Sequence, residues 1–518
     1  MSIRPAHGAP VALSVIAAGV GASEPRSNTS AVTGVSLDSR TIQPGDLYAA
    51  LPGAHVHGAQ FAAQARDRGA VAILSDPAGL DLISQAGIDL PVLRVPDPRA
   101  VLGAASALIY ATAPPGLALV GVTGTNGKTT TAYLIESALR AHGQLVGLMS
   151  TVETRIGERH VPSVRTTPEA TDVHALVAAM REAGVATCVM EVSSHALSLH
   201  RVDGLVYDVA VFTNLSQDHL DHHKTMENYY RAKADLFTPE RARHRVICVD
   251  DEWGQRLARE AMIPLDTLSS TGRAAQWQIR AEPGEPAFTL VGPDLTLELT
   301  SALPGDFNRV NTALAALTLL ALGHDAAAVR AAVGTDPHVP GRMERVGPTG
   351  AGRPRREALE AMPQGVVDYA HTPDAVAAAL TALRPGAAPG ALIVVLGAGG
   401  DRDSGKRAAM GAAAAQIADV VLVTDDNPRS EDPAVIRAAV LAGARERAPE
   451  KDIREIPDRR EAIRAAVAAG LGAGAGAIVA VVGKGHERGQ DIAGIIHPFD
   501  DRAELAAALD AAATARAR

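Results

Sequence analysis

The feature of the sequence that most constrains the fold is the stretch LALVGVTGTNGKTTTAYLIESALRAHG. Its pattern predicts a buried strand, a glycine-rich turn and then a helix. Gly124 and Gly127 would let backbone N–H groups turn toward an anion at the start of that helix, where Lys128 can reach outer phosphates. Thr129 can bind Mg²⁺, although the regular Walker pattern needs a glycine in place of Val122. The stretch therefore predicts a phosphate-binding loop, which a switch, a motor, a kinase or a ligase could use.

The length of the chain, 518 residues, predicts two to four domains rather than one core. The net charge is −9 and there is no long basic run, which argues against a nucleic-acid or membrane-surface binder. No stretch is apolar enough to insert into a bilayer. Cys188 and Cys248 both lie in apolar runs and are expected to be core thiols in a reducing compartment. We therefore expect a cytoplasmic protein with no nucleic-acid partner and no membrane insertion.

Three α/β units follow one another along the chain, and we place them at residues 1–115, 116–340 and 341–518. In the second and third units, apolar runs alternate with helical stretches, which predicts mostly parallel sheets covered on both faces. The segment from Gly347 to Gly365 is polar and rich in Gly, Pro and Arg, and is expected to be an exposed insertion.

Two predicted strands of the second unit are each followed by a polar cluster. These clusters are Glu191, Ser193, Ser194 and His195, and Asn214, Asp218, His219, Asp221, His222 and His223. Ligands of open α/β sheets bind beyond the carboxyl ends of strands, and carboxylate and imidazole there suit a metal shell around a nucleotide. The alternative is a zinc hydrolase, because QDHLDH differs from the H-x-H-x-D-H pattern only in having Gln217 at the first histidine. The phosphate loop upstream favours Mg²⁺.

Lysine is scarce in this chain, with six among 49 basic residues. We therefore expect a lysine to be kept where a guanidinium cannot serve. The six are Lys128, Lys224, Lys233, Lys406, Lys451 and Lys484. Lys233 stands on a predicted helix among aromatic and apolar residues, which singles it out.

An ordered set of motifs spans the chain from Val32 to Phe499 and resembles that of the Mur ligases. The motifs are GTNGKTT, RTTPEATDV, EVSSHALSLHRVDG, FTNLSQDHLDHH, YRAKADLF, GDFNRVNTALAAL, PGRMERV, VDYAHTPDA, GDRDSGKR, TDDNPRSEDP and VVGKGHE. The resemblance implies an α/β architecture of three domains: a UDP-sugar-binding domain, a P-loop ATP-binding domain and a Rossmann-like domain that binds the amino acid.

The chemistry that the resemblance implies is ATP-dependent amide bond formation through an acyl phosphate. It implies a peptidoglycan-precursor ligase that adds meso-diaminopimelate to the D-Glu of UDP-N-acetylmuramoyl-L-Ala-D-Glu. Phosphate supplies the leaving group that a carboxylate lacks, and catalysis is largely positioning and charge neutralisation. We expect a monomer whose third domain closes onto the second.

The resemblance also implies roles for individual residues. ATP contacts are expected from Gly124, Thr125, Asn126, Gly127, Lys128, Thr129, Thr130, Asn311, Arg342 and Asp368. Lys128, Glu191, His219 and Lys233 are expected to be catalytic. Two Mg²⁺ sites are expected, one with Thr129 and Glu191 and the other with His219 and Lys233. The resemblance implies that CO₂ carbamylates Lys233, which requires a neutral amine that arginine cannot supply.

Substrate contacts are implied in the same way. The UDP-sugar dipeptide is expected at Ser39, Thr166, Thr167, Ser193 and Arg201. Diaminopimelate is expected at Arg402, Asp426, Asn427, Pro428, Arg429, Gly483 and Glu487. Arg429 would grip the distal carboxylate and Glu487 would accept from the distal ammonium. Leu199 departs from the family, because many relatives have glutamine there.

Three alternatives remain open besides the leading hypothesis. One is an L-lysine-adding or folylpolyglutamate-synthetase-like ligase, against which Arg429 argues because lysine has no distal carboxylate. The zinc hydrolase is the second. The third is a catalytically silent P-loop protein that binds ATP without amine-dependent turnover.

Overall fold

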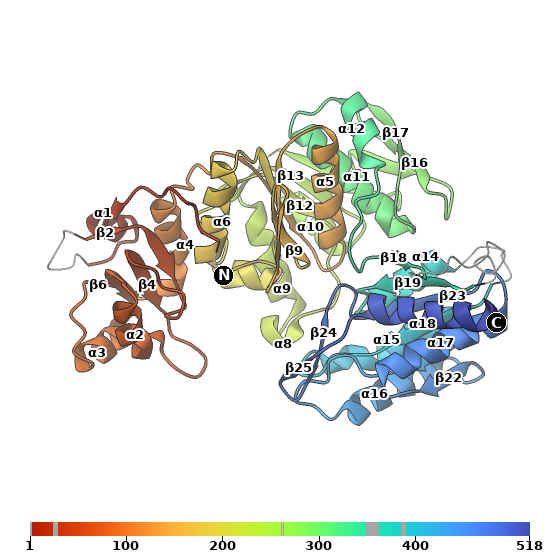
Figure 1. Cartoon of the computed structure of the whole chain (residues 1–518). Helices are drawn as coiled ribbons and strands as arrows, with labels where there is room; N and C mark the ends of the chain where they lie inside the picture. Colours follow the sequence, from red (N-terminus) through yellow and green to blue (C-terminus); the bar gives the residue numbers. More distant parts are fainter. Residues whose placement is uncertain are drawn as a thin grey trace.

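The structure is a computed structural model that describes residues 3–23, 30–260, 262, 264–348, 362–384 and 390–517. Its strands form three main sheets that follow one another along the chain (Figure 1). The predicted α/β class with mostly parallel sheets is confirmed. The limits of the three predicted units stay predictions. Within the described residues, no helix has the length and apolar character needed to cross a bilayer.

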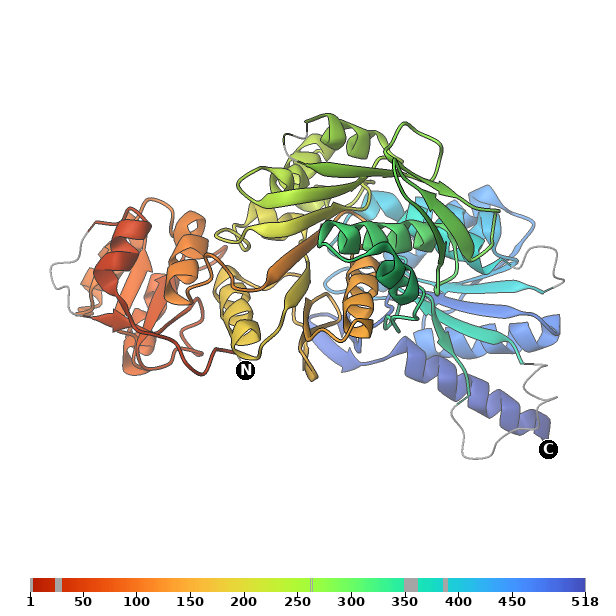
Figure 2. The same cartoon turned by 90° about the horizontal axis from the view of Figure 1, so that it is seen from above.

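The first sheet has four parallel strands in the order β3-β4-β5-β6. Its strands are β3 (Gly34–Ser36), β4 (Asp46–Ala50), β5 (Ala72–Ser75) and β6 (Val92–Arg94). The helices around it are α1 (Leu13–Gly19), α2 (Ala62–Asp67), α3 (Pro77–Gln85) and α4 (Pro98–Ile109). A short ladder of β1 (Val11–Ala12) and β2 (Ala31–Val32) lies beside them. This unit lies at one end of the molecule in both views (Figures 1 and 2).

The second sheet has eleven strands in the order β10-β9-β8-β11-β7-β12-β13-β14-β15-β16-β17. From β8 to β15 along this order the strands are parallel, and the outer strands on both sides pair antiparallel. The strands are β7 (Ala118–Thr123), β8 (Val146–Met149), β9 (Glu153–Ile156), β10 (Arg159–Pro162), β11 (Thr187–Glu191), β12 (Tyr207–Phe212), β13 (Ala242–Cys248), β14 (Leu265–Ser269), β15 (Trp277–Arg280), β16 (Ala287–Val291) and β17 (Thr296–Thr300).

Helices cover both faces of this second sheet because its central strands are apolar on both sides. Along β7, Val120 and Val122 pack into one core and Leu119 into the other. Its helices are α5 (Lys128–Ala141), α6 (Ala170–Glu182), α7 (Ser194–Ser198), α8 (Leu220–His223), α9 (Met226–Ala234), α10 (Glu252–Glu260), α11 (Asp306–Ala321) and α12 (Ala326–Val333). Cys188 and Cys248 are buried free thiols in these two cores, as predicted.

The third sheet has six strands in the order β18-β19-β23-β20-β21-β22, of which only β18 runs antiparallel. Its strands are β18 (Glu344–Val346), β19 (Gln364–Asp368), β20 (Leu392–Leu396), β21 (Val420–Val423), β22 (Asp452–Glu455) and β23 (Ile478–Val482). Its helices are α14 (Pro373–Leu383), α15 (Arg407–Ile417), α16 (Pro433–Arg447), α17 (Arg459–Ala473) and α18 (Asp501–Ala517). A hairpin of β24 (Gly489–Ile492) and β25 (Ile495–Pro498) follows β23. Most of the predicted insertion, residues 349–361, lies outside the described residues.

Candidate active site

The predicted phosphate loop connects the end of β7 to the start of α5. Gly124 has φ +148° and Gly127 has φ +86°, and a left-handed backbone of this kind favours glycine. A Cβ at Gly124 would lie 1.9 Å from Thr213 Oγ1, and one at Gly127 would lie 2.6 Å from Asn311 Oδ1. The structure therefore has no room for a side chain at either of these two glycines. The loop leads into a helix of 14 residues, whose first N–H groups have no partner within the helix and suit an anion.

Two lysine side chains converge on the carbonyl oxygen of Gly124. Lys128 Nζ donates to this oxygen and to Thr125 O, both at 2.8 Å. Lys233, which is 1% exposed on α9, donates to the same Gly124 oxygen at 2.8 Å. Burial lowers the pKa of both lysines, and the neighbouring Lys128 charge lowers the pKa of Lys233 further. The site therefore favours a neutral Lys233 amine.

Glu191 lies at the end of β11, beside the first turn of α5. Its Oε1 accepts from Thr129 Oγ1 at 2.9 Å and from Thr151 N at 2.8 Å. Arg342 reaches the same place from the chain segment before β18, since its Nη2 lies 3.3 Å from Thr129 Oγ1. Carboxylate and hydroxyl oxygens are the hard ligands that Mg²⁺ takes, so Thr129 and Glu191 fit the predicted metal.

A cavity of about 630 Å³ joins these groups to the third sheet. Its lining includes every predicted ATP residue except Gly124, and also Glu191, His219 and Lys233. Asn311 accepts from Thr131 Oγ1 at 3.2 Å, and Asp368 accepts from two backbone N–H groups at 2.8 Å each. Burial raises the pKa of Asp368. The predicted ATP set, drawn from distant parts of the chain, thus surrounds one space, which is called the nucleotide cavity below because of these predicted residues.

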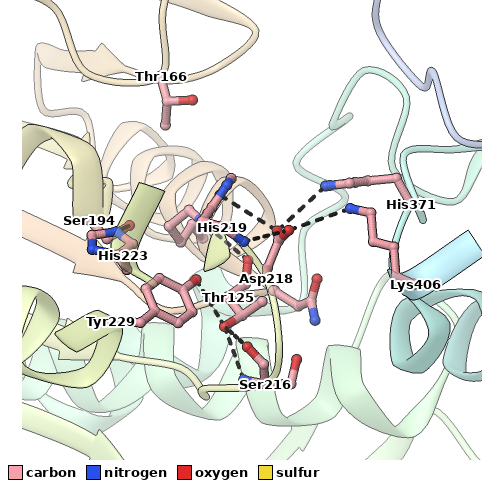
Figure 3. Close-up of polar contacts among 12 residues, drawn as sticks. Thr125, Thr166, Ser194, Ser216, Asp218, His219, His223, Tyr229, His371 and Lys406 are labelled. Carbon is pink, nitrogen blue, oxygen red and sulfur yellow. Dashed lines mark hydrogen bonds and ion pairs between the residues drawn. The ribbon is translucent and has the colours of Figure 1, made fainter. Parts of the chain in front are cut away.

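Asp218 is one of the residues at which the second and third units meet beside this cavity (Figure 3). Its carboxylate lies 3.4 Å from Lys406 Nζ and 3.8 Å from His371 Nε2, both from the third unit. His219 Nε2 lies 3.5 Å away on the same side as the phosphate loop. Asp218 is 5% exposed. Although burial opposes it, the positive groups around Asp218 hold the pKa of its carboxyl well below the usual range.

The histidines predicted as a cluster do come together. The His195 ring lies 4.8 Å from His219, 4.3 Å from His222 and 5.5 Å from His223, measured between centroids. Burial lowers the pKa of His219 to about 3, despite the opposing effect of Asp218. In the part of the chain that the structure describes, no group of three or more His, Cys, Asp or Glu residues is arranged to hold a metal ion. The predicted metal roles of His219 and Lys233 stay predictions.

The residues predicted for the UDP-sugar dipeptide lie in two places. Ser39 lines a second cavity of about 810 Å³ between the first two units and donates to Gln64 Oε1 at 2.6 Å. Thr166 and Ser193 line the nucleotide cavity instead. Thr167 donates to the backbone oxygen of Glu191 at 2.9 Å. Arg201 forms an ion pair with Glu169 at 3.0 Å, and neither Thr167 nor Arg201 lines the two cavities.

The residues predicted for diaminopimelate follow three neighbouring strands of the third sheet. Asp426, Asn427, Pro428 and Arg429 come after β21, Gly483 and Glu487 after β23, and Arg402 after β20. Arg429 donates to Gly400 O at 2.5 Å, and Arg402 is exposed. A Cβ at Gly399 would lie 2.9 Å from Arg429 Nη1 and 4.0 Å from Arg402 Cγ, so the two arginines share one side. Asn427 Nδ2 donates to Glu487 Oε2 at 2.8 Å.

Some residues of this region were not assigned a role from sequence. Lys406 and His371 contact Asp218, and Lys484 contacts Asn427 and Glu487. Both lysines belong to the set of six that lysine scarcity singled out. Lysine scarcity could therefore have identified Lys406 and Lys484, whereas nothing in the sequence marked His371 except the motif in which it stands.

Comparison with known proteins gives a consistent result over most of the chain. Residues 31–110, 122–319 and 341–485 match the Mur ligase family catalytic domain, the Mur ligase middle domain, and the Mur ligase glutamate ligase domain, respectively.

Named relatives agree with these matches. The chain is 49% identical over 513 residues to the UDP-N-acetylmuramoyl-L-alanyl-D-glutamate–2,6-diaminopimelate ligase of Streptomyces avermitilis, with 98% of each chain covered. It is 46% identical over 487 residues to the UDP-N-acetylmuramyl-tripeptide synthetase of Leifsonia xyli subsp. xyli, covering 92% of this chain and 91% of the relative. A solved structure of a UDP-N-acetylmuramoyl-L-alanyl-D-glutamate–2,6-diaminopimelate ligase superposes with a TM-score of 0.62 at 32% identity, covering 93% of this chain and 95% of the other.

Proposed function

The chain belongs to the Mur ligase family, and on that basis we propose that it uses ATP to join meso-2,6-diaminopimelate to UDP-N-acetylmuramoyl-L-Ala-D-Glu. The product is the UDP-sugar tripeptide, a precursor of peptidoglycan. The observation that carries the proposal is the single cavity in which the loop around Lys128 faces Glu191, Arg342 and Asp368. The names of the relatives supply the two substrates.

In the proposed reaction, the D-Glu carboxylate attacks the γ-phosphorus of ATP, ADP leaves, and the carboxylate becomes an acyl phosphate. The amine of diaminopimelate then attacks the acyl carbon, and phosphate leaves as the amide forms. The N–H groups at the start of α5 and the charge of Lys128 hold the phosphates in line for this transfer. Mg²⁺ held by Thr129 and Glu191 would neutralise phosphate charge.

Selection of the amino acid is assigned to the strand ends of the third sheet. Arg429 and Arg402 offer guanidinium groups to the distal carboxylate of diaminopimelate, which L-lysine lacks. Glu487 offers a carboxylate to the distal ammonium. Only the arginines favour diaminopimelate over lysine, because lysine also carries a distal ammonium that Glu487 could bind. The two arginine side chains lie beside one another around Gly399, and Asn427 donates to Glu487.

The central experiment measures phosphate release with ATP, Mg²⁺ and UDP-N-acetylmuramoyl-L-Ala-D-Glu, comparing meso-diaminopimelate with L-lysine. Release that depends on diaminopimelate is the expected result. Phosphate release with lysine instead would support a ligase but contradict the assignment of Arg429 to the distal carboxylate. ATP binding without amine-dependent phosphate release would indicate the catalytically silent P-loop protein. Bound zinc, found by metal analysis, would indicate the zinc hydrolase.

A carbamate on Lys233 is part of the proposal. The fit rests on the Lys233 amine, which is 1% exposed and lies beside Lys128. Burial and the Lys128 charge lower the pKa of this amine, which favours the neutral form that attacks CO₂. The modification would turn this buried amine into an anion suited to a second Mg²⁺ with His219. The cytoplasmic location and the monomeric state stay predictions.

The carbamate has a direct test. Carbon-13 NMR of the enzyme in ¹³C-bicarbonate is expected to show a carbamate resonance that is absent from Lys233→Met. Turnover of that variant should fall by about 10–100-fold, the usual loss when a group that orients a metal is removed. Lys451→Met is the control, since Lys451 Nζ donates to backbone oxygens far along the third sheet. A resonance that persists in Lys233→Met would contradict the assignment.

A further inference from the structure

Lys484 is a buried lysine that the proposed mechanism does not use. It is the second residue after β23, its side chain is 0% exposed, and it is one of only six lysines in the chain. Its Nζ lies 2.9 Å from Asn427 Oδ1, 3.2 Å from Glu487 Oε2 and 3.7 Å from Asp426 Oδ1. The ammonium thus faces three oxygens, all of them from residues that the sequence assigned to the amino acid.

The contacts of Asn427 fix the orientation of its amide. Oδ1 accepts from Lys484 Nζ at 2.9 Å and from Asp491 N at 3.0 Å, while Nδ2 donates to Glu487 Oε2 at 2.8 Å. A reversed amide would point its N–H groups at an ammonium and at a backbone N–H, and would leave the carboxylate without a donor. Lys484 is therefore one of the two donors that hold Asn427 in this orientation.

Glu487 is fixed through only one of its two oxygens. Oε2 accepts from both Lys484 and Asn427, whereas no hydrogen bond reaches Oε1 from any residue that the structure describes. The Glu487 side chain is 31% exposed, so it lies at an open face rather than in the core. Oε1 is the oxygen left to accept from a ligand.

We propose that Lys484 is a positioning residue for amino-acid selection, which holds Asn427 and Glu487 so that Glu487 Oε1 faces the distal ammonium of the incoming amino acid. This inference rests on the proposed function and adds a residue to it. Lys484 also supplies the positive charge that lets Asp426 and Glu487 stay close together. Its compact ammonium fits where a planar guanidinium would displace Asn427, which explains a lysine in an arginine-rich chain.

The test is a double-mutant cycle on steady-state kinetics with Lys484→Met, Glu487→Gln and the combined variant. Lys484→Met is expected to raise KM for diaminopimelate at least tenfold, with KM for ATP and for the UDP-sugar dipeptide within twofold of wild type. Because Lys484 acts through Glu487, adding Lys484→Met to Glu487→Gln should change KM by less than threefold. Lys451→Met, a lysine outside the site, should match wild type.

Two results would overturn the proposal. One is a rise of all three KM values together in Lys484→Met. The other is a rise in KM for diaminopimelate in the combined variant that equals the product of the rises in the two single variants. That result would mean that Lys484 does not act through Glu487. Lys484→Arg gives a second measurement should Lys484→Met not fold, and is expected to show the same selective rise in KM. Failure of the proposed function is separate, because the wild-type enzyme would then not turn over diaminopimelate at all.

Discussion

Gly124 is a residue at which both the backbone conformation and the packing of neighbouring atoms require glycine. Its φ of +148° strains any other residue, and a Cβ there would meet Thr213 Oγ1 at 1.9 Å. Gly143, just beyond the other end of α5, has φ +75° and nothing within 4 Å of an added Cβ. An alanine at either position would suffer backbone strain, but only an alanine at Gly124 would also clash with neighbouring atoms.

We expect Gly124→Ala to abolish ATP binding and Gly143→Ala to leave it unchanged. The strain of a positive φ should cost each variant about 1 kcal/mol of stability. Only Gly124→Ala must also push the phosphate loop off Thr213. Titration with a fluorescent ATP analogue, alongside thermal unfolding, measures both effects. Equal ATP affinity in the two variants would show that the loop tolerates a Cβ.

Individual site residues could be predicted where a motif or a composition bias marked them. Lysine scarcity singled out six lysines. Of these, Lys128 and Lys233 line the cavity, Lys406 contacts Asp218 beside it, and Lys484 lies among the residues predicted for diaminopimelate. The partners of these lysines were not predictable, because Asp218 and Lys406 lie 188 residues apart and meet only through the packing of two sheets. A guanidinium or ammonium in a sequence carries no information about which distant carboxylate it will face.

At the scale of elements, the parallel strands could be predicted and the edge strands could not. The runs that became β7, β11, β12 and β13 are mostly apolar in their second halves and are closely followed by glycine or polar residues, which is typical of buried parallel strands. Among the antiparallel strands, β10 is mostly exposed, and β16 and β17 alternate between buried and more exposed residues. A short polar strand of this kind depends on its neighbours for pairing, so its sequence alone resembles that of a loop.

Helix α6 carries a histidine that links three elements. His174 is 0% exposed, its Nε2–H donates to Asp203 O at 2.9 Å, and its Nδ1 accepts from Thr112 Oγ1 at 2.5 Å. Burial lowers the pKa of His174 to about 4, against about 6.5 in the unfolded chain. Between these values the unfolded chain binds a proton that the folded protein does not. The free energy of unfolding therefore falls as pH drops from 6.5 to 4.

For His174 we expect a loss of roughly 2 kcal/mol in the free energy of unfolding between pH 7 and pH 5. His174→Gln keeps a donor and an acceptor but cannot titrate, so its stability should fall less over this range. Urea unfolding at both pH values measures the difference. Other buried histidines contribute equally to both proteins, so identical pH dependence in the two would contradict a neutral His174.

At the scale of the whole molecule, charged groups form part of the contact between the second and third units. Lys406 and His371 of the third unit both face Asp218, beside the nucleotide cavity. Lys406 is 11% exposed and Asp218 is 7% exposed in their side chains, so water screens this pair little. The pair is therefore placed to hold the third unit against the second beside this cavity.

We expect Lys406→Met to lower kcat about tenfold or more, since a hydrogen bond to a charged group contributes roughly 1.5–3 kcal/mol. In small-angle scattering, wild type should contract when ATP and the UDP-sugar dipeptide are added, and Lys406→Met should contract less. Lys451→Met provides the matched lysine control. Equal contraction and equal kcat in Lys406→Met and wild type would remove Asp218 from domain closure.

The division of labour between two sheets has an evolutionary consequence. The groups assigned to carboxylate activation are anchored mainly on the second sheet, while those assigned to the amino acid follow β20, β21 and β23 of the third. Mutations in these third-sheet loops can therefore change which amino acid is accepted without disturbing the phosphate loop. Such a chain can acquire a new building-block preference through a few loop substitutions, and cell-wall peptides can diversify while their activation chemistry is inherited unchanged.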